Sequence, residues 1–401
     1  MAQNDSRVSS YKCILFIVKT EELKYWIGFS RVPGIGRVRL SQLKEHFGNL
    51  EDAWKASESK LKQAGLDSRS VNALLLLRQK ISLDQEVEKL ERYKVKTLTC
   101  EDQYYPSRLK EIYDYPPVLY VRGELPAQDI PCLAAVGTRR PTIYGRQVAE
   151  EIIADLVRSN LVIVSGLARG IDTVAHRTAL DNRGKTIAVF GSGLDIIYPA
   201  ENAKLALDIV EQGALVSEFP LGTRPKAENF PLRNRIMSGL SLGVLVVEAG
   251  EKSGALITAF QALAQNREVF AIPGSILSPA SKGTNRLIQE GAKLVCNCAD
   301  ILEELNLGII APQQLEIKEF LPANEAESLI LKQLTPEPVH IDEICRSSGL
   351  PVPEVSSTLA ILELKGVARQ IGNMNYVLAR DKKGGVPRPP CPLSGEGREG
   401  K

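Results

Sequence analysis

Histidine and paired cysteine are scarce in this sequence. Only three of its 401 residues are histidine, at positions 46, 176 and 340. The seven cysteines contain no CxxC pair, and their odd number does not allow complete pairing into disulfides. Zinc sites and disulfide frameworks both need such clusters. We therefore expect no bound metal and a reducing, cytoplasmic compartment.

Long apolar runs and an excess of one charge are also absent. The apolar run CILFIV, residues 13–18, is too short to span a bilayer or to form an ordinary signal sequence. Lysine and arginine number 50 against 48 acidic residues, which gives a formal net charge of +2. The sequence thus predicts no membrane partner, and any site for a polyanion must be a local patch.

The common nucleotide-binding motifs are missing as well. No GxxxxGK[ST] phosphate loop occurs, and the run Gly137, Thr138, Arg139 does not match the GxGxxG of a dinucleotide fold. The second predicted strand of the sheet ends in Ser165 and Gly166, without an acidic residue to hold a ribose hydroxyl. Hydrolysis of ATP and binding of NAD are disfavoured, and no cofactor is expected.

Periodicity divides the chain into segments of different character. Helical spacing with short glycine breaks fills most of the first hundred residues, and from Cys132 strand and helix patterns alternate. Near the C-terminus, three short helices precede two strands, which is the order of a winged helix-turn-helix. The predicted organisation is a loosely held leader (1–20), a helical domain (21–96), a sheet domain (97–305), a linker (306–324), a winged helix (325–380) and a disordered tail (381–401).

The alternating region predicts an α/β fold around a parallel sheet. Its strand candidates are CLAAVG, LVIVSG, KTIAVFG, GALVSEF, LGVLVVEA, EVFAIPG and KLVCNC, preceded by a short strand at residues 118–122. Continuous apolar runs such as VLVV are typical of strands covered on both faces. Ligands of such sheets bind beyond the carboxyl ends of the strands, so function should lie in the loops there.

Three of these loops are rich in glycine, serine, threonine and arginine. They are GTRRPTIYG (137–145), SGLARGID (165–172) and GSGLDIIYPAEN (191–202). Glycine lets the backbone approach an oxygen-rich ligand, helix N-terminal amides supply donors, and Arg139 and Arg140 add charge. Each loop alone is also compatible with a tight turn. Turns do not require arginine or serine, so the three loops together indicate an anion site.

The segment ENFPLRNRIMSGLS, residues 228–241, places two cations near a predicted helix start. Pro231 is a favoured first-turn residue, so Arg233 and Arg235 lie close to the positive end of the helix dipole. A bound anion would make that position favourable. Phe230 lies beside them, and basic residues interleaved with aromatic ones suit single-stranded nucleic acid. The alternative is that the arginines form salt bridges across the sheet edge and Phe230 belongs to the core.

Carboxylates in the same region raise the question of catalysis. Asp172 and His176 are four residues apart on one predicted helix, a spacing that suits a general acid and base. An aspartate that caps the helix beside a satisfied histidine is the alternative, and we favour it. Glu218 and Glu248 stand alone at strand ends, without a metal cluster or a partner nucleophile. No catalytic residue is assigned.

The flanking regions carry weaker signals. VPGIG, residues 32–36, matches the hairpin of a helix-hairpin-helix unit, whose amides hold a phosphate without reading sequence, and Arg31, Arg37 and Arg39 surround it. A glycine turn between helices and an interaction module of the SAM type are the alternatives. The predicted recognition helix of the winged helix, residues 353–366, has a single cation. A protein contact or a structural role is therefore favoured there over DNA binding.

The order of these motifs resembles the DprA/Smf family of DNA-processing proteins. The resemblance is carried by GTRRPTIYG, SGLARGIDTVAH, GSGLDIIYPAEN, SEFPLGTRPKAENFPLRNRIMSGLS, VVEAGEKSGALITA, AIPG and KGTNRLIQEGA, within residues 135–292. It implies an extended Rossmann domain that binds single-stranded DNA without catalysis. It also implies a homodimer that helps to load the RecA recombinase during natural transformation. Leu287 and Ile288 are candidates for the shared face, and the alternative is that they belong to the core.

The resemblance also implies which residues touch DNA. Carried over by motif and extended to the neighbouring loops, the set is Gly137, Thr138, Arg139, Arg140, Ser165, Gly166, Gly193, Asn202, Phe230, Arg233, Asn234, Arg235 and Lys252. One departure is Ala200, which stands where some relatives have a basic residue. The same Rossmann subtype resembles phosphoribohydrolases that cut nucleoside monophosphates. Their PGGxGT segment is not reproduced by PGSILSPASKGTN, so this enzyme remains the alternative.

Overall fold

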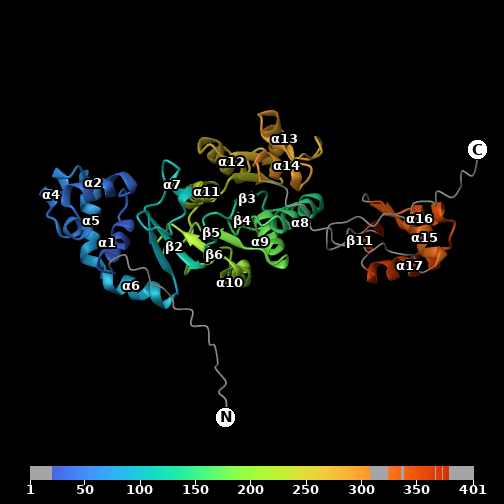
Figure 1. The fold of residues 1–401 in the computed structure, drawn as a ribbon, viewed down its shortest axis with the longest axis horizontal. Helices are drawn as coiled ribbons and strands as arrows, with labels where there is room; N and C mark the ends of the chain where they lie inside the picture. The colour runs from blue at the N-terminus through green and yellow to red at the C-terminus, as the bar shows by residue number, and fades with distance from the viewer. Residues whose placement is uncertain (1–19, 308–323, 336–337, 366, 373, 379–401) are drawn as a thin grey trace, which may run out of the picture. The chain divides into compact units, whose positions relative to one another are not determined.

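A computed structural model gives the fold, and its parts can be described separately (Figure 1). It describes residues 20–307, 324–335, 338–365, 367–372 and 374–378. The predicted leader, most of the predicted linker and the predicted tail lie outside these residues. The chain divides into two compact units, residues 1–309 and 310–401.

The first unit is built on a nine-stranded sheet. Six neighbouring strand pairs among β3 to β9 are parallel, while β1 and β2 join one edge antiparallel. In spatial order the strands are β1 (Lys96–Thr99), β2 (Val118–Gly123), β6 (Ala214–Ser217), β5 (Thr186–Val189), β4 (Val162–Ser165), β3 (Cys132–Val136), β7 (Gly243–Val246), β8 (Glu268–Ala271) and β9 (Lys293–Leu294). The strand order reverses between β3 and β7, and such sheets bind their ligands at the carboxyl ends of the strands near this point.

Helices cover both faces of the sheet, which explains the continuous apolar strands. Leu133 and Ala135 of β3 pack into one core, while the alternating Ala134 and Val136 pack into the core on the other face. The first face is covered by α8 (Ile143–Arg158), α9 (Ile171–Asp181), α10 (Ala203–Gln212) with the short η1 (Ala200–Asn202), and α14 (Cys298–Glu304). The second is covered by α7 (Ser107–Lys110), α11 (Asn229–Leu240), α12 (Gly254–Ala264) and α13 (Lys282–Gln289).

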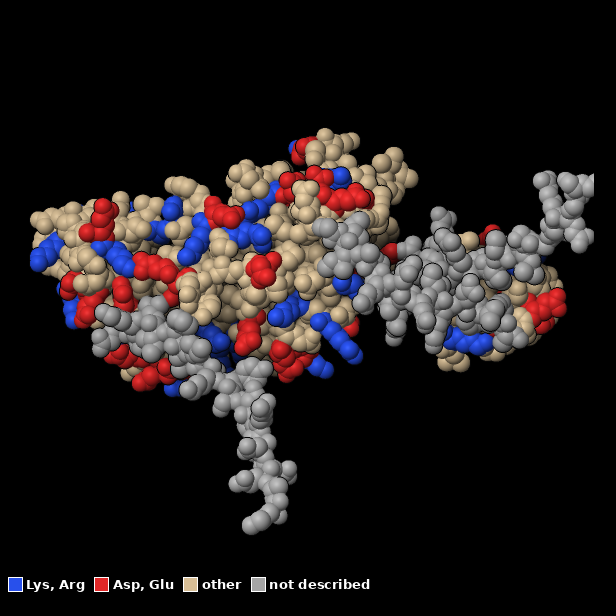
Figure 2. All heavy atoms as spheres, in the orientation of Figure 1, with Lys and Arg blue, Asp and Glu red and all other residues tan. Residues whose placement is uncertain are grey.

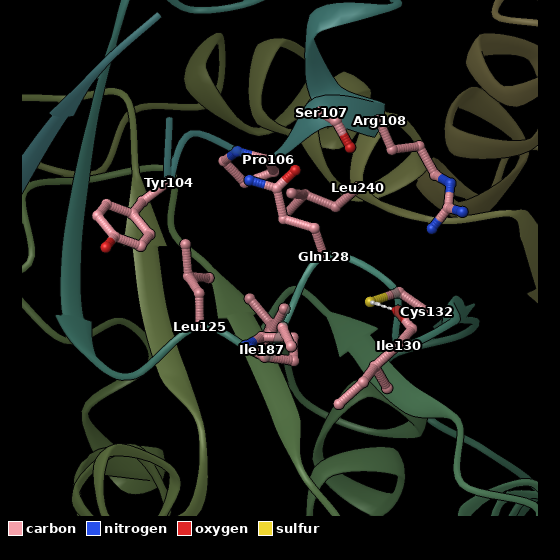
Figure 3. Close-up of a pocket in the computed structure, with 12 residues that line it drawn as sticks. Tyr104, Pro106, Ser107, Arg108, Leu125, Gln128, Ile130, Cys132, Ile187 and Leu240 are labelled. Atoms are coloured by element: carbon pink, nitrogen blue, oxygen red, sulfur yellow. Dashed lines mark hydrogen bonds between the residues drawn. The ribbon is translucent and has the colours of Figure 1, made fainter. Parts of the chain in front are cut away.

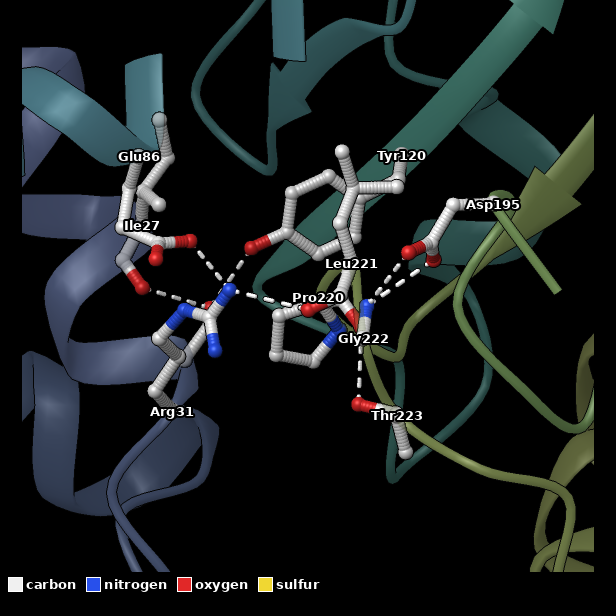
Figure 4. Close-up of polar contacts among 10 residues, drawn as sticks. Ile27, Arg31, Glu86, Tyr120, Asp195, Pro220, Leu221, Gly222 and Thr223 are labelled. Atoms are coloured by element: carbon white, nitrogen blue, oxygen red, sulfur yellow. Dashed lines mark hydrogen bonds and ion pairs between the residues drawn. The ribbon is translucent and has the colours of Figure 1, made fainter. Parts of the chain in front are cut away.

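Six N-terminal helices pack beyond the edge formed by β1 and β2 (Figure 1). They are α1 (Thr20–Ser30), α2 (Arg37–Phe47), α3 (Leu50–Lys55), α4 (Glu58–Gln63), α5 (Ser68–Lys80) and α6 (Leu83–Arg92). Their buried side chains form one core with those of β2 and α10. Polar contacts reinforce the junction, because Ser30 and Tyr120 share a hydrogen bond of 2.8 Å and Arg31 donates to the Leu221 carbonyl at 3.0 Å (Figure 4).

The second unit is a small winged helix with its own core. Its elements are α15 (Glu325–Leu331), β10 (Val339–His340), α16 (Ile341–Ser348), α17 (Val352–Leu364), β11 (Ala368–Gly372) and β12 (Asn375–Leu378). The three strands form an antiparallel sheet in the order β10, β12, β11. Lys365, the single cation predicted for the recognition helix, directly follows the last residue of α17. It donates a hydrogen bond of 2.6 Å to the buried Glu327.

The predicted fold class is confirmed: an α/β sheet unit with a helical N-terminal region and a C-terminal winged helix. Two details differ. The short β1 was not predicted, because its sequence KTLT contains a single apolar residue, Leu98, and so shows no apolar pattern. Helix α11 begins at Asn229, two residues before Pro231. Arg233 and Arg235 therefore lie in the second turn rather than at the helix start.

Among the described helices, none has both the length and the apolar character that a bilayer crossing requires.

Candidate nucleic-acid interface

The loop after β3 is held by a single buried carboxylate. Glu248, which follows β7, accepts hydrogen bonds from the Thr142 amide (2.8 Å) and hydroxyl (2.7 Å), and its carbonyl accepts one from the Thr138 amide (2.7 Å). Thr142 in turn caps α8. Gly145 is required beside it, since a Cβ there would lie 2.5 Å from the Glu248 carboxylate. The result is a fixed loop whose two arginines, Arg139 and Arg140, are exposed.

The loop after β4 is held in a similar way. The buried Asp172 carboxylate accepts hydrogen bonds from the amides of Gly166 (3.1 Å) and Ala168 (3.3 Å). Burial raises the pKa of this carboxyl, while nearby Arg233 and the two amides act in the opposite direction. Gly170 has φ +80°, and a Cβ on it would overlap the Thr138 carbonyl. The loops after β3 and β4 therefore touch, as the sheet topology predicts.

Arg233 lies underneath these two loops. It is only 4% exposed, and its Nη1 donates to the Val189 carbonyl at 2.8 Å. A Cβ on Gly166 would overlap its guanidinium. Burial lowers its pKa to about 10, with a smaller contribution from Arg139 in the same direction. Arg233 thus places a positive charge behind the loops, where Arg139 and Arg140 carry the exposed charge.

Two aromatic rings stand beside this charge. Tyr198 and Phe230 have ring centroids 5.7 Å apart at an interplanar angle of 42°, and Tyr198 is 49% exposed. Phe230 packs on Gly191, where a Cβ would lie 3.1 Å from the ring. Asn202 fixes the neighbouring loop, because its side chain donates to the Leu167 carbonyl at 2.9 Å. Exposed arginine and partly exposed aromatic rings at the same edge of a sheet suit a single strand, whose phosphates bind cations and whose bases stack on rings.

Several predicted site residues lie elsewhere. Arg235 points to a different side of α11, where it pairs with Glu218 and with Asp114 at 3.3 Å. Arg235 therefore follows the alternative prediction, in which the arginines of this segment form salt bridges. Residues two apart on a helix face different directions, which is why Arg233 and Arg235 separate.

The remaining predicted residues are also dispersed. A Cβ on Gly193 would lie 2.7 Å from the Pro220 carbonyl, so this glycine packs against the loop after β6 rather than facing the arginines. Lys252 is exposed in the loop before α12. Asn234 is buried within α11, and Ser165 donates its hydroxyl to the Ala135 carbonyl at 2.7 Å. Thr138, Arg139, Gly166, Asn202, Phe230 and Arg233 are the members that the structure brings together.

The supporting roles of the two carboxylates were predicted only in part. Asp172 is not the N-cap of α9, as the favoured alternative expects, but it does accept hydrogen bonds from the amides of the preceding loop. Glu248 was predicted only as a lone carboxylate at a strand end, and it accepts a hydrogen bond from the Thr142 amide. His176 is fully buried and shares a 2.7 Å hydrogen bond with Thr186, and burial lowers its pKa to about 3. A lone carboxylate at the end of a buried strand, close to glycine-rich loops, was the available signal. It indicates a loop anchor as readily as an acid or base.

On the face of the first unit shown in Figure 2, basic and acidic side chains are interspersed. A separate pocket lies near the opposite ends of the strands, with Cys132, Ile187 and Leu240 among its lining residues (Figure 3). Most of that lining is apolar, so it does not suit a phosphate.

Among the residues that the structure describes, no group of three or more potential metal ligands occurs.

Each of the two units matches a known protein family. Residues 96–306 match the family described as DNA recombination-mediator protein A, and residues 321–373 match the DprA winged helix domain. The chain is 37% identical over 392 residues to the protein Smf of Synechocystis, covering 88% of this chain and 98% of the relative. It is 43% identical over 324 residues to the protein Smf of Escherichia coli, covering 78% and 86%. A crystal structure of DNA processing protein A from Streptococcus pneumoniae is similar, with a TM-score of 0.60 and 39% identity over 70% of this chain and 96% of that one.

Proposed function

This chain belongs to the DprA/Smf family of DNA recombination mediators, and on that premise we propose that its sheet unit binds single-stranded DNA at the loops after β3, β4 and β5. The observation that carries the proposal is the placement of two features at the same edge of the sheet: exposed Arg139 in the loop after β3, and the Tyr198 and Phe230 ring pair, which packs on Gly191 in the loop after β5. Phosphates would contact the arginines, and bases would stack on the rings.

The buried groups support binding rather than catalysis. Asp172 and Glu248, the two buried carboxylates that hold the loops after β3 and β4, accept two hydrogen bonds each from the backbone or from Thr142. A general base must lie within reach of its substrate, whereas Asp172 is 6% exposed and Glu248 is 2% exposed. Their present bonds instead fix the loops in advance, which lowers the entropy that a ligand must overcome.

The family suggests the wider role. We propose that the chain acts as a homodimer in the cytoplasm, where it protects single strands that enter the cell and helps RecA to assemble on them. In a RecA ATPase assay on a strand coated with single-strand-binding protein, the chain should shorten the lag. An unchanged lag would contradict this part of the proposal and leave the DNA site untouched.

The binding site is tested by fluorescence anisotropy with a labelled oligo-dT at several salt concentrations. Arg139→Ala should weaken binding and reduce the slope of log affinity against log salt by about 0.7, the value for one phosphate on a single strand. Phe230→Ala should cost about 1–3 kcal/mol with little change in slope, because it removes stacking. Arg158→Ala is the matched control, since Arg158 is a surface residue at the far end of α8, paired with Asp155.

Two outcomes would reject the proposal. One is wild-type affinity and salt slope for both Arg139→Ala and Phe230→Ala. The other is sustained release of base from nucleoside monophosphates that disappears in Glu248→Gln, which would identify an enzyme of the phosphoribohydrolase type. Double-stranded DNA of the same length should bind more weakly, because its paired bases are not free to stack.

A further inference from the structure

A second groove lies next to the proposed site, on the other side of α11. The hairpin between α1 and α2, the segment 113–118 and two residues of α11 surround it, and its volume is about 490 Å³. That volume is in the range of pockets that hold small organic ligands, and a nucleotide falls within it. Leu232 and Arg235 are the two α11 residues in its wall.

The groove carries a cation that no acidic residue neutralises. Among the described residues, Arg37 has no ion-pair partner, and its guanidinium lies 4.8 Å from the Tyr115 ring centroid and 5.5 Å from that of Tyr113. Tyr113 is nevertheless 82% exposed. A guanidinium stacked on tyrosine keeps its N–H groups available for a phosphate, and an exposed ring is available to a base.

The other charges of the groove are already paired. Arg39 forms an ion pair with Asp67, and Arg235 pairs with Glu218 and Asp114. Burial raises the pKa of the Glu218 carboxyl, with Arg235 acting in the opposite direction. Arg37 is thus the cation left to attract an anion, and Arg235 offsets the acidic side chains that would repel one.

The two sites share one helix. Phe230 belongs to the proposed DNA site, and Leu232 and Arg235 belong to the groove. At 1.5 Å per residue, Phe230 and Arg235 are about 8 Å apart along α11. Since stacked bases repeat every 3.4 Å or so along a strand, a strand that leaves Phe230 reaches the groove within a few nucleotides.

We propose that this groove is a second contact for the same single strand, in which Arg37 binds a phosphate and Tyr113 stacks on a base. The N-terminal helical region would then lengthen the binding footprint rather than serve only as a scaffold. The inference rests on the proposed function, and the following experiment separates the failure of the one from the failure of the other.

Affinity is measured for a short oligo-dT of about 4 nucleotides and a long one of about 20, lengths that bracket the usual site size of single-strand binders. The double variant Arg37→Ala with Tyr113→Ala should weaken the long oligomer roughly tenfold and reduce its salt slope by about 0.7. It should leave the short oligomer unchanged. The matched control is Arg92→Ala with Tyr93→Ala, an exposed pair in the same helical region that does not line the groove.

The inference fails if the groove variant binds the long oligomer as tightly as the control does. It also fails if both oligomers weaken equally, because the substitutions would then act on the first site through α11. Arg139→Ala should weaken both oligomers. If Arg139→Ala changes neither while the groove variant weakens the long one, the proposed first site is wrong and the groove contact stands.

Discussion

Gly166 is the position where the smallest change should do the most damage. In Gly166→Ala the new Cβ would overlap the Arg233 guanidinium, which cannot retreat because it is buried and bonded to the Val189 carbonyl. Losing a hydrogen bond from a charged donor costs about 1.5–3 kcal/mol. Crowding a packed interior adds about 1–3 kcal/mol. We therefore expect a loss of roughly 3–6 kcal/mol in the stability of the sheet unit.

The assay is thermal unfolding followed by circular dichroism, together with oligo-dT binding. At about 2–4 °C per kcal/mol, the midpoint of the sheet unit should fall by roughly 6 °C or more. Gly254→Ala is the matched control, because it is at the first position of α12 with no other atom within 4 Å of the new Cβ. It should be neutral or slightly stabilising. If Gly166→Ala unfolds with the control and binds DNA normally, the close packing of Arg233 under this loop is refuted.

Three further changes test the supporting groups. Glu248→Gln replaces an acceptor of the Thr142 amide and hydroxyl, so hydrogen exchange in residues 138–145 should accelerate by at least tenfold, and unchanged exchange would rule out the anchor. His176 has a folded pKa of about 3 and an unfolded pKa near 6.5, so the unfolded state takes up the proton first as pH falls. Stability should drop by about 1.4 kcal/mol per pH unit between roughly pH 6 and 4, and His176→Gln should flatten that slope in urea titrations. Arg31→Met should loosen residues 219–224, because Arg31 donates to the carbonyl of that loop (Figure 4), whereas Arg39→Met should leave their exchange unchanged.

The sheet could be predicted from the sequence because its signal is local. Runs such as VLVV are apolar at every position, which indicates strands covered on both faces. Helical segments separate these runs, which indicates parallel strands whose following loops lie at one edge of the sheet. The short β1 has no such run, and it is ordered by its ladder with β2, in which Thr97 lies opposite Tyr120. That pairing depends on a partner more than twenty residues away and leaves no periodic trace.

The site could be predicted only in part. Exposed loop residues such as Arg139 follow from the position of the loop at the carboxyl end of a strand. The direction of Arg235 depends on whether Glu218 and Asp114 stand nearby, which is a tertiary property. Helical spacing alone separates Arg233 from Arg235, and applying it to the RNR segment would have shown that the two arginines serve different surfaces.

The central claim is that single-stranded DNA lies across the loops at the carboxyl edge of the sheet. Photocrosslinking with an oligomer that contains 5-iodouracil tests it most directly, because the base reacts with the aromatic ring on which it stacks. The account predicts that the crosslinked peptides contain Tyr198 and Phe230, and that Arg139→Ala reduces their yield. Crosslinks confined to α17 of the winged helix, with none in residues 137–235, would contradict it.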